Sequence, residues 1–257
     1  VGAIVAKESR AAGVQWNLSP VVDVNNNPLN PIINTRSFSE NPGIVSEYAA
    51  QYIRGLQENG MISTAKHFPG HGDTQTDSHS SLAMIPSDSS RLWSVELKPF
   101  IDVANAGVDA IMIAHVHAPD FQPESDIPAT LSKFWVTDIL KNKIGYKGII
   151  ITDGMGMGGV TKNYADDYAI IEAVKAGCDV IIQNYDIVGS INAIEDAVKN
   201  NEISIEQINS SALKMLKMKE NAGLHLNPFV DLDFMMKTIG IKEHREASDR
   251  ISTEAIT

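Results

Sequence analysis

The sequence has little cysteine, an excess of acidic over basic side chains, and no long apolar run. Cys178 is the single cysteine among 257 residues, which excludes an intramolecular disulfide framework and an all-cysteine metal cluster. The 21 Lys and Arg are outnumbered by 32 Asp and Glu, giving a formal net charge of −11. Nucleic acid is therefore not an expected partner, because its binding needs clustered cations. No membrane span is expected either, since no apolar run approaches about 18 residues.

The start of the chain leaves the cellular compartment open. The residues after Val1 lack the charged head and apolar core of a signal peptide. Exported bacterial proteins without disulfides are common, so both the bacterial cytoplasm and the periplasm fit the composition. The start at Val1 is compatible with a fragment of a longer protein whose native N-terminus is absent.

The order of apolar segments predicts an α/β fold. Hydrophobic residues make up 43% of the chain, which is typical of a globular domain. Short β-branched runs alternate with longer amphipathic stretches, as in βα units around a parallel sheet. The predicted strands are 16–24, 61–67, 109–115, 147–153 and 178–184. The predicted helices are 42–59, 90–106, 132–143, 164–176, 188–200 and 204–222, the last with a capping box from Ser204 to Gln207.

Polar side chains follow these strands where each one ends. Asp23 lies at the end of the first predicted strand and His115 at the end of the third, while His67 ends the second and Asp153 the fourth. In a (β/α) barrel these ends form the catalytic face. The polar connection 69–90 is much longer than the usual βα loop of about 2–6 residues, and long rim loops are often functional.

Histidines are concentrated between residues 67 and 117, with His71, His79 and His117 joining the two already named. Asp73 and Asp77 could add carboxylate ligands for a metal. The spacing does not match an HExxH helix, so no metal site is predicted, and a metal-dependent hydrolase is the least favoured reading. The competing interpretation for His115 and His117 is that both are buried, hydrogen-bonded rim residues.

Two short segments carry the chemistry that we expect. In Asp77-Ser78-His79, a carboxylate two residues before a histidine can fix its tautomer and raise its pKa, which suits a general acid and base. Asp153 ends an isoleucine-rich strand and precedes the glycine-rich segment 154–159, where a substrate can approach an ionised carboxylate acting as a nucleophile. An aspartate before glycines is about equally often a turn former.

Together these motifs resemble the family 3 glycoside hydrolases, and among them the bacterial β-N-acetylglucosaminidases. The resemblance rests on the string KHFPGHGD at 66–73 followed by DSH at 77–79. It is reinforced by SPVVDV at 19–24, NPII at 30–33, RSF at 36–38, PF at 99–100, IAH at 113–115, TD at 152–153 and AGCD at 176–179. Gly154 and Ser39 depart from the family pattern, at positions that do not touch the expected chemistry.

The resemblance implies a retaining exo-glycosidase without a cofactor, acting on terminal β-linked N-acetylglucosamine of cell-wall fragments or related glycans, as in peptidoglycan recycling. Asp153 would be the nucleophile, and His79, oriented by Asp77, the acid/base. The substrate-binding residues implied in the same way are Arg36, Lys66, His67, Asp23, His115 and Met157. Two alternatives stay open: a β-glucosidase or β-xylosidase of the same family, and a truncated fragment that binds sugar weakly.

The resemblance also implies the domain organisation. Residues 1–223 would form a TIM-type barrel that is incomplete at its N-terminus, because the family has two further βα units before the equivalent of Val1. Residues 224–257 would be a linker towards a second domain of the parent chain. A C-terminal helical extension packed against the barrel fits this segment equally well.

Overall fold

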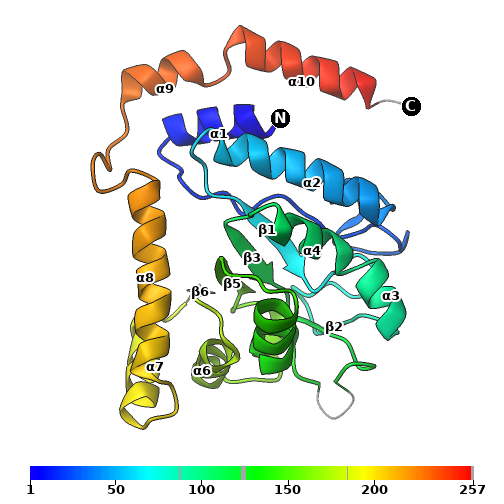
Figure 1. Cartoon of the computed structure of the whole chain (residues 1–257), viewed down its shortest axis with the longest axis vertical. Helices are drawn as coiled ribbons and strands as arrows, with labels where there is room; N and C mark the ends of the chain where they lie inside the picture. The colour runs from blue at the N-terminus through cyan, green and yellow to red at the C-terminus, as the bar shows by residue number, and fades with distance from the viewer. Residues whose placement is uncertain (87, 123–125, 184, 256–257) are drawn as a thin grey trace.

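The computed structural model describes residues 1–86, 88–122, 126–183 and 185–255. Its centre is a four-stranded sheet in the order β1 (Thr64–Phe68), β3 (Ala110–Ile113), β5 (Ile149–Gly154) and β6 (Val180–Ile182) (Figure 1). Each neighbouring pair is parallel. The predicted α/β fold with a parallel sheet is confirmed, and four of the five predicted strands are present as strands.

Helices connect the strands and surround the sheet. Before β1 come α1 (Gly2–Ala11), the 3-10 turn η1 (Asn34–Arg36) and α2 (Pro42–Gln57). The later connections contain α3 (Ser89–Ser94), α4 (Lys98–Asn105), the 3-10 turn η2 (Ala129–Leu131), the π-helix η3 (Phe134–Lys143), α5 (Gly158–Thr161) and α6 (Asp166–Ala176). After β6 follow α7 (Ile187–Lys199), α8 (Ile205–Asn221), α9 (Leu232–Thr238) and α10 (Lys242–Glu254). The Ser204 side chain accepts a hydrogen bond from the Gln207 N–H, which is one half of the predicted capping box, whereas the Gln207 side chain donates to the Val174 carbonyl.

The predicted first strand, 16–24, does not form a continuous strand. Its residues make isolated bridges between Trp16 and Ile62 and between Val21 and Lys66, both parallel. Backbone hydrogen bonds still run along the pair, including the one from the Val22 N–H to the Lys66 carbonyl at 2.7 Å. The ladder is interrupted because Pro20 has no N–H to donate. The segment therefore flanks β1 as an extended edge, and the barrel is not closed among the described residues.

The predicted helix 90–106 is also wrong as a single helix. Asp88 caps α3 by accepting from the Arg91 N–H, and the chain leaves the helix at Val95. A new helix, α4, starts at Lys98, with Pro99 in its first turn. Proline suits that position because the N–H it lacks would have no intrahelical partner there. The break directs Glu96 inward, where it is almost fully buried.

The core lies between the sheet and the helices on its outer side. Phe68, at the end of β1, packs edge to face on Phe100 with ring centroids 5.4 Å apart, and contacts Trp135 at 6.3 Å. All three side chains are fully buried. Burial of such a side chain stabilises the fold by about 1.5–3 kcal/mol, so the chain next to His67 is firmly held. A small parallel pair, β2 (Ala83–Met84) with β4 (Val116–His117), extends the sheet system beyond the main strand ends.

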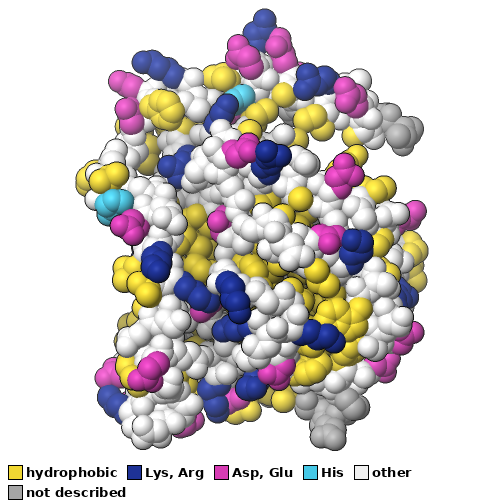
Figure 2. Space-filling model, in the orientation of Figure 1, with side chains coloured by type: hydrophobic (Ala, Val, Ile, Leu, Met, Phe, Trp, Pro, Cys, Tyr) yellow, Lys and Arg dark blue, Asp and Glu magenta, His cyan; other side chains and the backbone are white. Residues whose placement is uncertain are grey.

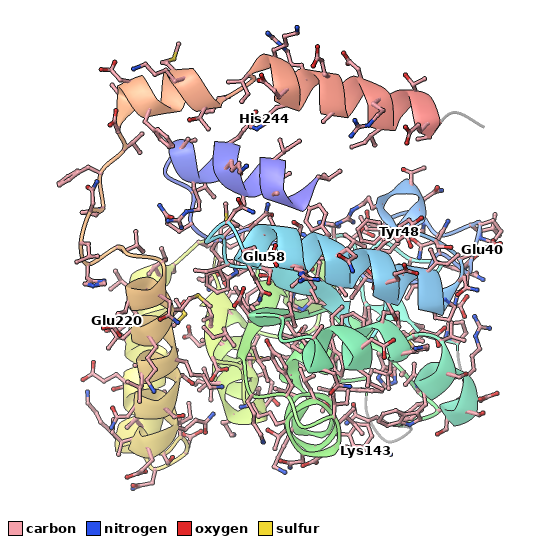
Figure 3. The ribbon with its side chains drawn as sticks, turned by 45° about the horizontal axis from the view of Figure 1, so that its top comes forward. Glu40, Tyr48, Glu58, Lys143, Glu220 and His244 are labelled. Atoms are coloured by element: carbon pink, nitrogen blue, oxygen red, sulfur yellow. The ribbon has the colours of Figure 1, made fainter. Side chains whose placement is uncertain are left out.

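The C-terminal helices return to the start of the chain. Figure 1 shows α9 and α10 crossing above α1, on the side of α1 away from the sheet. The Glu8 carboxylate accepts hydrogen bonds from the Gly240 N–H at 2.8 Å and from His244 Nδ1 at 2.7 Å. His244 lies between α10 and α1 (Figure 3). Hydrophobic side chains, including Leu226 and Phe229, are exposed along the connection from α8 to α9 (Figure 2). Within the described ranges, no helix is long and apolar enough to cross a membrane.

Candidate active site

Asp23 anchors the histidine-rich segment that follows β1. Its side chain is fully buried, and Oδ2 lies 2.7 Å from Nδ1 of His67. Its other oxygen accepts the backbone N–H of His71 at 2.7 Å. Burial raises the pKa of Asp23, but the charge and hydrogen bond of His67 outweigh it, so this pKa lies below its ordinary value. Asp23 therefore stays ionised and orients the His67 imidazole, leaving Nε2 as the ring atom that a ligand could use.

Lys66 lies among the charges of the predicted site. Its side chain is half-buried, and its pKa is lowered by burial and then by the nearby guanidinium of Arg36. The carboxylates of Asp153 and Asp23 act in the opposite direction. Arg36 itself is exposed at the end of η1, where Nη1 donates to the Ile32 carbonyl at 3.0 Å. The fold thus brings four of the predicted site residues into one electrostatic neighbourhood.

Asp153 is half-buried near the carboxyl end of β5. Its Oδ1 accepts the Gly154 N–H at 2.8 Å. The carbonyl of Gly154 accepts a hydrogen bond from Nε2 of His115 at 2.9 Å, and Nδ1 of His115 lies 2.8 Å from Thr130 Oγ1. Burial lowers the pKa of His115, so this ring is neutral near pH 7 and carries its proton on Nε2. His115 is fully buried and holds the main chain beside Asp153.

His79 and Asp77 form the predicted pair. Nδ1 of His79 lies 2.7 Å from Oδ1 of Asp77, and the His79 backbone N–H donates to the same oxygen at 2.9 Å. The His79 side chain is 60% exposed and that of Asp77 39%. Partial burial raises the pKa of Asp77, but the hydrogen bonds from His79 outweigh it and this pKa lies below its ordinary value. The carboxylate therefore stays charged and directs Nε2 of His79 outward.

The loop that carries His79 is attached to the turn after Asp153. The Gly158 N–H donates to the His79 carbonyl at 2.9 Å, and the Gly159 N–H donates to the Ser78 carbonyl at 3.0 Å. The contact is so close that a Cβ on Gly158 would lie 2.5 Å from the Ser80 carbonyl oxygen. Met157, half-buried, starts this turn and precedes α5. Two segments that are far apart in sequence thus meet at the strand ends.

The remaining acidic and histidine side chains do not gather around a common point. Asp73 forms an ion pair with Arg91 at 2.7 Å, and the imidazole of His71 contacts Thr74 and Ser78. His117 is buried, with Nε2 3.9 Å from Asp126. Across the described parts of the chain, no group of three or more His, Cys, Asp or Glu side chains is arranged to hold a metal ion.

Three residues in these contacts were not predicted: Thr130, Ser78 and Gly158. Thr130 comes from η2, far from His115 in sequence, and no local pattern points to it. Ser78 lies inside the Asp77–His79 triplet, yet a serine in a polar loop carries no signal of its own. Gly158 belongs to the glycine-rich segment that the sequence analysis singled out. Its contact with the 74–81 loop was not predicted, because nothing in the segment specifies that loop.

Comparison with known proteins agrees with this geometry. The sequence model of the glycosyl hydrolase family 3 N-terminal domain matches residues 1–218. The chain belongs to glycosyl hydrolase family 3. Along its whole length it is 33% identical to β-hexosaminidase A of Pseudoalteromonas piscicida, of which it covers 46%.

Solved structures of family 3 proteins share the fold. A family 3 β-N-acetylglucosaminidase from Paenibacillus sp. str. FPU-7 superposes with a TM-score of 0.90 at 36% identity, over 98% of this chain and 48% of that one. A β-glucoside phosphorylase superposes with a TM-score of 0.89 at 25% identity, over 95% of this chain and 45% of that one. The chain thus spans about half the length of these relatives. The predicted family resemblance, the fold of a partial (β/α) barrel and the assignment to the glycoside hydrolases are confirmed.

Proposed function

We propose that the protein is a retaining exo-glycosidase that removes terminal β-linked N-acetylglucosamine from cell-wall fragments or related glycans. The observation that carries this proposal is the attachment of the His79–Asp77 pair to the turn that follows Asp153, through the Gly158 hydrogen bond of 2.9 Å. This attachment supports the proposal because it ties the loop of a group that can give and take a proton to the turn that follows a carboxylate suited to nucleophilic attack. The relatives named hexosaminidase and β-N-acetylglucosaminidase support the choice of sugar.

In the first step, a carboxylate oxygen of Asp153 attacks the anomeric carbon. The bond from that carbon to the leaving oxygen breaks, and protonated His79 gives its Nε2 proton to that oxygen. In the second step, neutral His79 takes a proton from water as the water oxygen attacks the anomeric carbon, and the ester to Asp153 breaks. Retaining glycosidases usually use two carboxyl groups, and here the imidazole replaces one of them.

The other assigned side chains would hold the sugar. Lys66 and Arg36 provide cationic donors to sugar hydroxyls, and His67 adds an oriented ring nitrogen. Charge-assisted hydrogen bonds of this kind fix the ring and can strengthen as positive charge develops at the anomeric carbon. Asp23 orients His67. Met157 precedes the two glycines, Gly158 and Gly159, whose N–H groups form hydrogen bonds to the loop that carries the proposed acid/base. We further propose that residues 224–257 link this domain to the rest of a parent chain.

The choice of sugar is tested by comparing turnover of 4-nitrophenyl β-N-acetylglucosaminide with that of the β-glucoside and the β-xyloside, in the protein with its complete native chain. We expect the N-acetylglucosaminide to be preferred and the product to keep the β configuration. A faster glucoside or xyloside would select the alternative within the family. Turnover that rises with added phosphate and yields a sugar 1-phosphate would replace hydrolysis by phosphorolysis, the reaction named for one structural relative.

A further inference from the structure

The imidazole of His71 connects the sugar-binding segment with the loop that carries His79. Its backbone N–H donates to Asp23 at 2.7 Å, and its ring lies edge to face with the His67 ring, with the centroids 6.0 Å apart. Nδ1 lies 2.6 Å from Thr74 Oγ1, and Nε2 lies 2.9 Å from Ser78 Oγ. His71, Thr74 and Ser78 are each at most 2% exposed, so water does not compete for these hydrogen bonds.

The surrounding donors fix which nitrogen carries the proton. The Thr74 hydroxyl donates to the His71 carbonyl at 3.0 Å, so its oxygen is left to accept from the ring. Nδ1 of His71 is therefore protonated, and Nε2 accepts the hydroxyl proton of Ser78. Burial, the largest cause, lowers the pKa of His71 and keeps the ring in this neutral form.

We propose that His71 is a positioning residue which, through Ser78, holds the acid/base His79 at the reacting centre. Ser78 stands between the two members of the catalytic pair. Its hydroxyl is fixed by His71, and its carbonyl accepts from Gly159 on the nucleophile side at 3.0 Å. Ser78 thus attaches the loop at two points. Its side chain bonds to the segment that would bind the sugar, and its carbonyl bonds to the turn after Asp153.

The test uses the complete native chain and three β-N-acetylglucosaminides, with phenol, 4-nitrophenol and 2,4-dinitrophenol as leaving groups. Ser78→Ala removes the hydrogen bond to His71 without substituting any assigned catalytic or sugar-binding residue. We expect it to lower kcat/KM for the phenyl substrate about 10- to 100-fold, because misplacement of a catalytic group by about 1 Å has that effect. The loss on the dinitrophenyl substrate should stay under about 3-fold, since a good leaving group needs little proton transfer.

Ser80→Ala is the matched control. Its hydroxyl donates to the Asp77 carbonyl in the same loop, at 2.9 Å, and in the described part of the chain it makes no hydrogen bond to His71. This variant should change kcat/KM by no more than about 2-fold for any of the three substrates. Thr74→Val removes the acceptor for Nδ1 and should produce a smaller loss with the same dependence on the leaving group.

A spectroscopic measurement does not depend on turnover. The ¹⁵N shifts of the His71 ring should show protonated Nδ1 and unprotonated Nε2 at pH 7, and Thr74→Val should give a mixture of tautomers. The opposite tautomer in the unsubstituted protein would overturn the inference.

The inference rests on the proposed function, and His79→Ala separates the two. If His79→Ala shows the leaving-group dependence and Ser78→Ala does not, or if Ser78→Ala lowers all substrates equally, the role of His71 is wrong and the proposed function stands. If His79→Ala lacks the dependence, both are wrong.

Discussion

At the scale of single residues, the two imidazole–carboxylate pairs of the site are equally short and differ in burial. Asp23 and His67 are enclosed, whereas Asp77 and His79 face solvent, although both pairs have an N–O distance of 2.7 Å. Burial suits the ligand-holding role that we propose for His67. Exposure suits the acid/base role that we propose for His79, because substrate and water can reach its imidazole.

Replacing His79 by alanine should impair poor substrates more than activated ones. Loss of a general acid typically costs about 10²- to 10⁴-fold, and that cost shrinks as the leaving group becomes more acidic. We expect at least about 100-fold loss of kcat on the phenyl glycoside and a much smaller loss on the dinitrophenyl glycoside. Equal losses of kcat on both glycosides, measured at saturating concentrations of each, would contradict the acid/base assignment.

Replacing Asp23 by asparagine should destabilise the fold in a manner that depends on pH. Breaking a buried ion pair by removing one partner costs about 3–5 kcal/mol. Because the pKa of Asp23 is below its ordinary value of 3.8, its contribution is complete above that value and is lost as the pH falls through the folded-state pKa.

Urea midpoints of the unsubstituted protein and Asp23→Asn should therefore differ at pH 7 and converge in acid. Asp102→Asn, which breaks the half-exposed pair with Lys98, serves as the control and should cost less than about 1 kcal/mol. A difference between the Asp23 variant and the parent that stays constant down to pH 3 would show that its carboxylate is not the titrating group.

At the scale of elements, the contact between the 74–81 loop and the first turn of α5 depends on the small size of two glycines. A Cβ on Gly158 would lie within 2.9 Å of two backbone oxygens, those of His79 and Ser80. Backbone atoms cannot move aside as the end of a long side chain can, so the loop itself has to shift. Since the loop carries His79, the proposed acid/base, we expect a change in the first turn of α5 to affect proton transfer.

Gly158→Ala should therefore lower turnover of the phenyl glycoside by about 10-fold or more. Its cost in stability should be about 1–3 kcal/mol, as for other overpacked sites. Gly43→Ala, in the first turn of α2, is the matched control because its Cβ would meet one side-chain oxygen at 3.2 Å. Comparable effects of both substitutions on turnover would show that the Gly158 contact does not position His79.

The sequence predicted the parallel strands and most helices because their apolar periodicity is local. It was wrong at 16–24 and at 90–106, where Pro20 and Pro99 change the backbone pattern inside an otherwise suitable apolar stretch. The N-cap at Ser204 was correct because its donor, the Gln207 N–H, lies only three residues away, whereas the Gln207 side chain bonds to Val174 and does not complete the predicted capping box. The attachment of Ser78 to Gly159 could not be predicted, since nothing in either segment specifies the other.

At the scale of the whole molecule, one acidic side chain of α1, that of Glu8, forms hydrogen bonds to the C-terminal helical segment. Hydrogen bonds from the Gly240 N–H and from His244 lower the pKa of Glu8. This contact is present above the ordinary glutamate value of 4.5 and is lost as the pH falls through the lowered pKa. No residue of α10 is buried, so we expect the hydrogen bond between His244 and Glu8 to contribute strongly to holding the first turn of α10 against α1.

Glu8→Gln should loosen that restraint without changing catalysis. Amide exchange across the first turn of α10 should become faster, turnover should change less than about 2-fold, and the stability loss should stay under about 1 kcal/mol. Glu243→Gln removes an equivalent charge from the exposed face of the same turn and should leave the exchange unchanged. An unchanged exchange rate in Glu8→Gln would show that other contacts hold α10.

By itself, the sequence determined the parallel α/β architecture, the family and the short motifs to which we assign the chemistry, because periodicity and motif spacing are properties of neighbouring residues. The tertiary structure decided which of these motifs meet. Hydrogen bonds of Asp23 to the chain after β1, of His71 to Ser78, and of Gly158 to His79 each join groups whose contact depends on how the chain folds back. Catalysis depends on distances of a few ångströms, and those distances are set only when the strands and loops pack together.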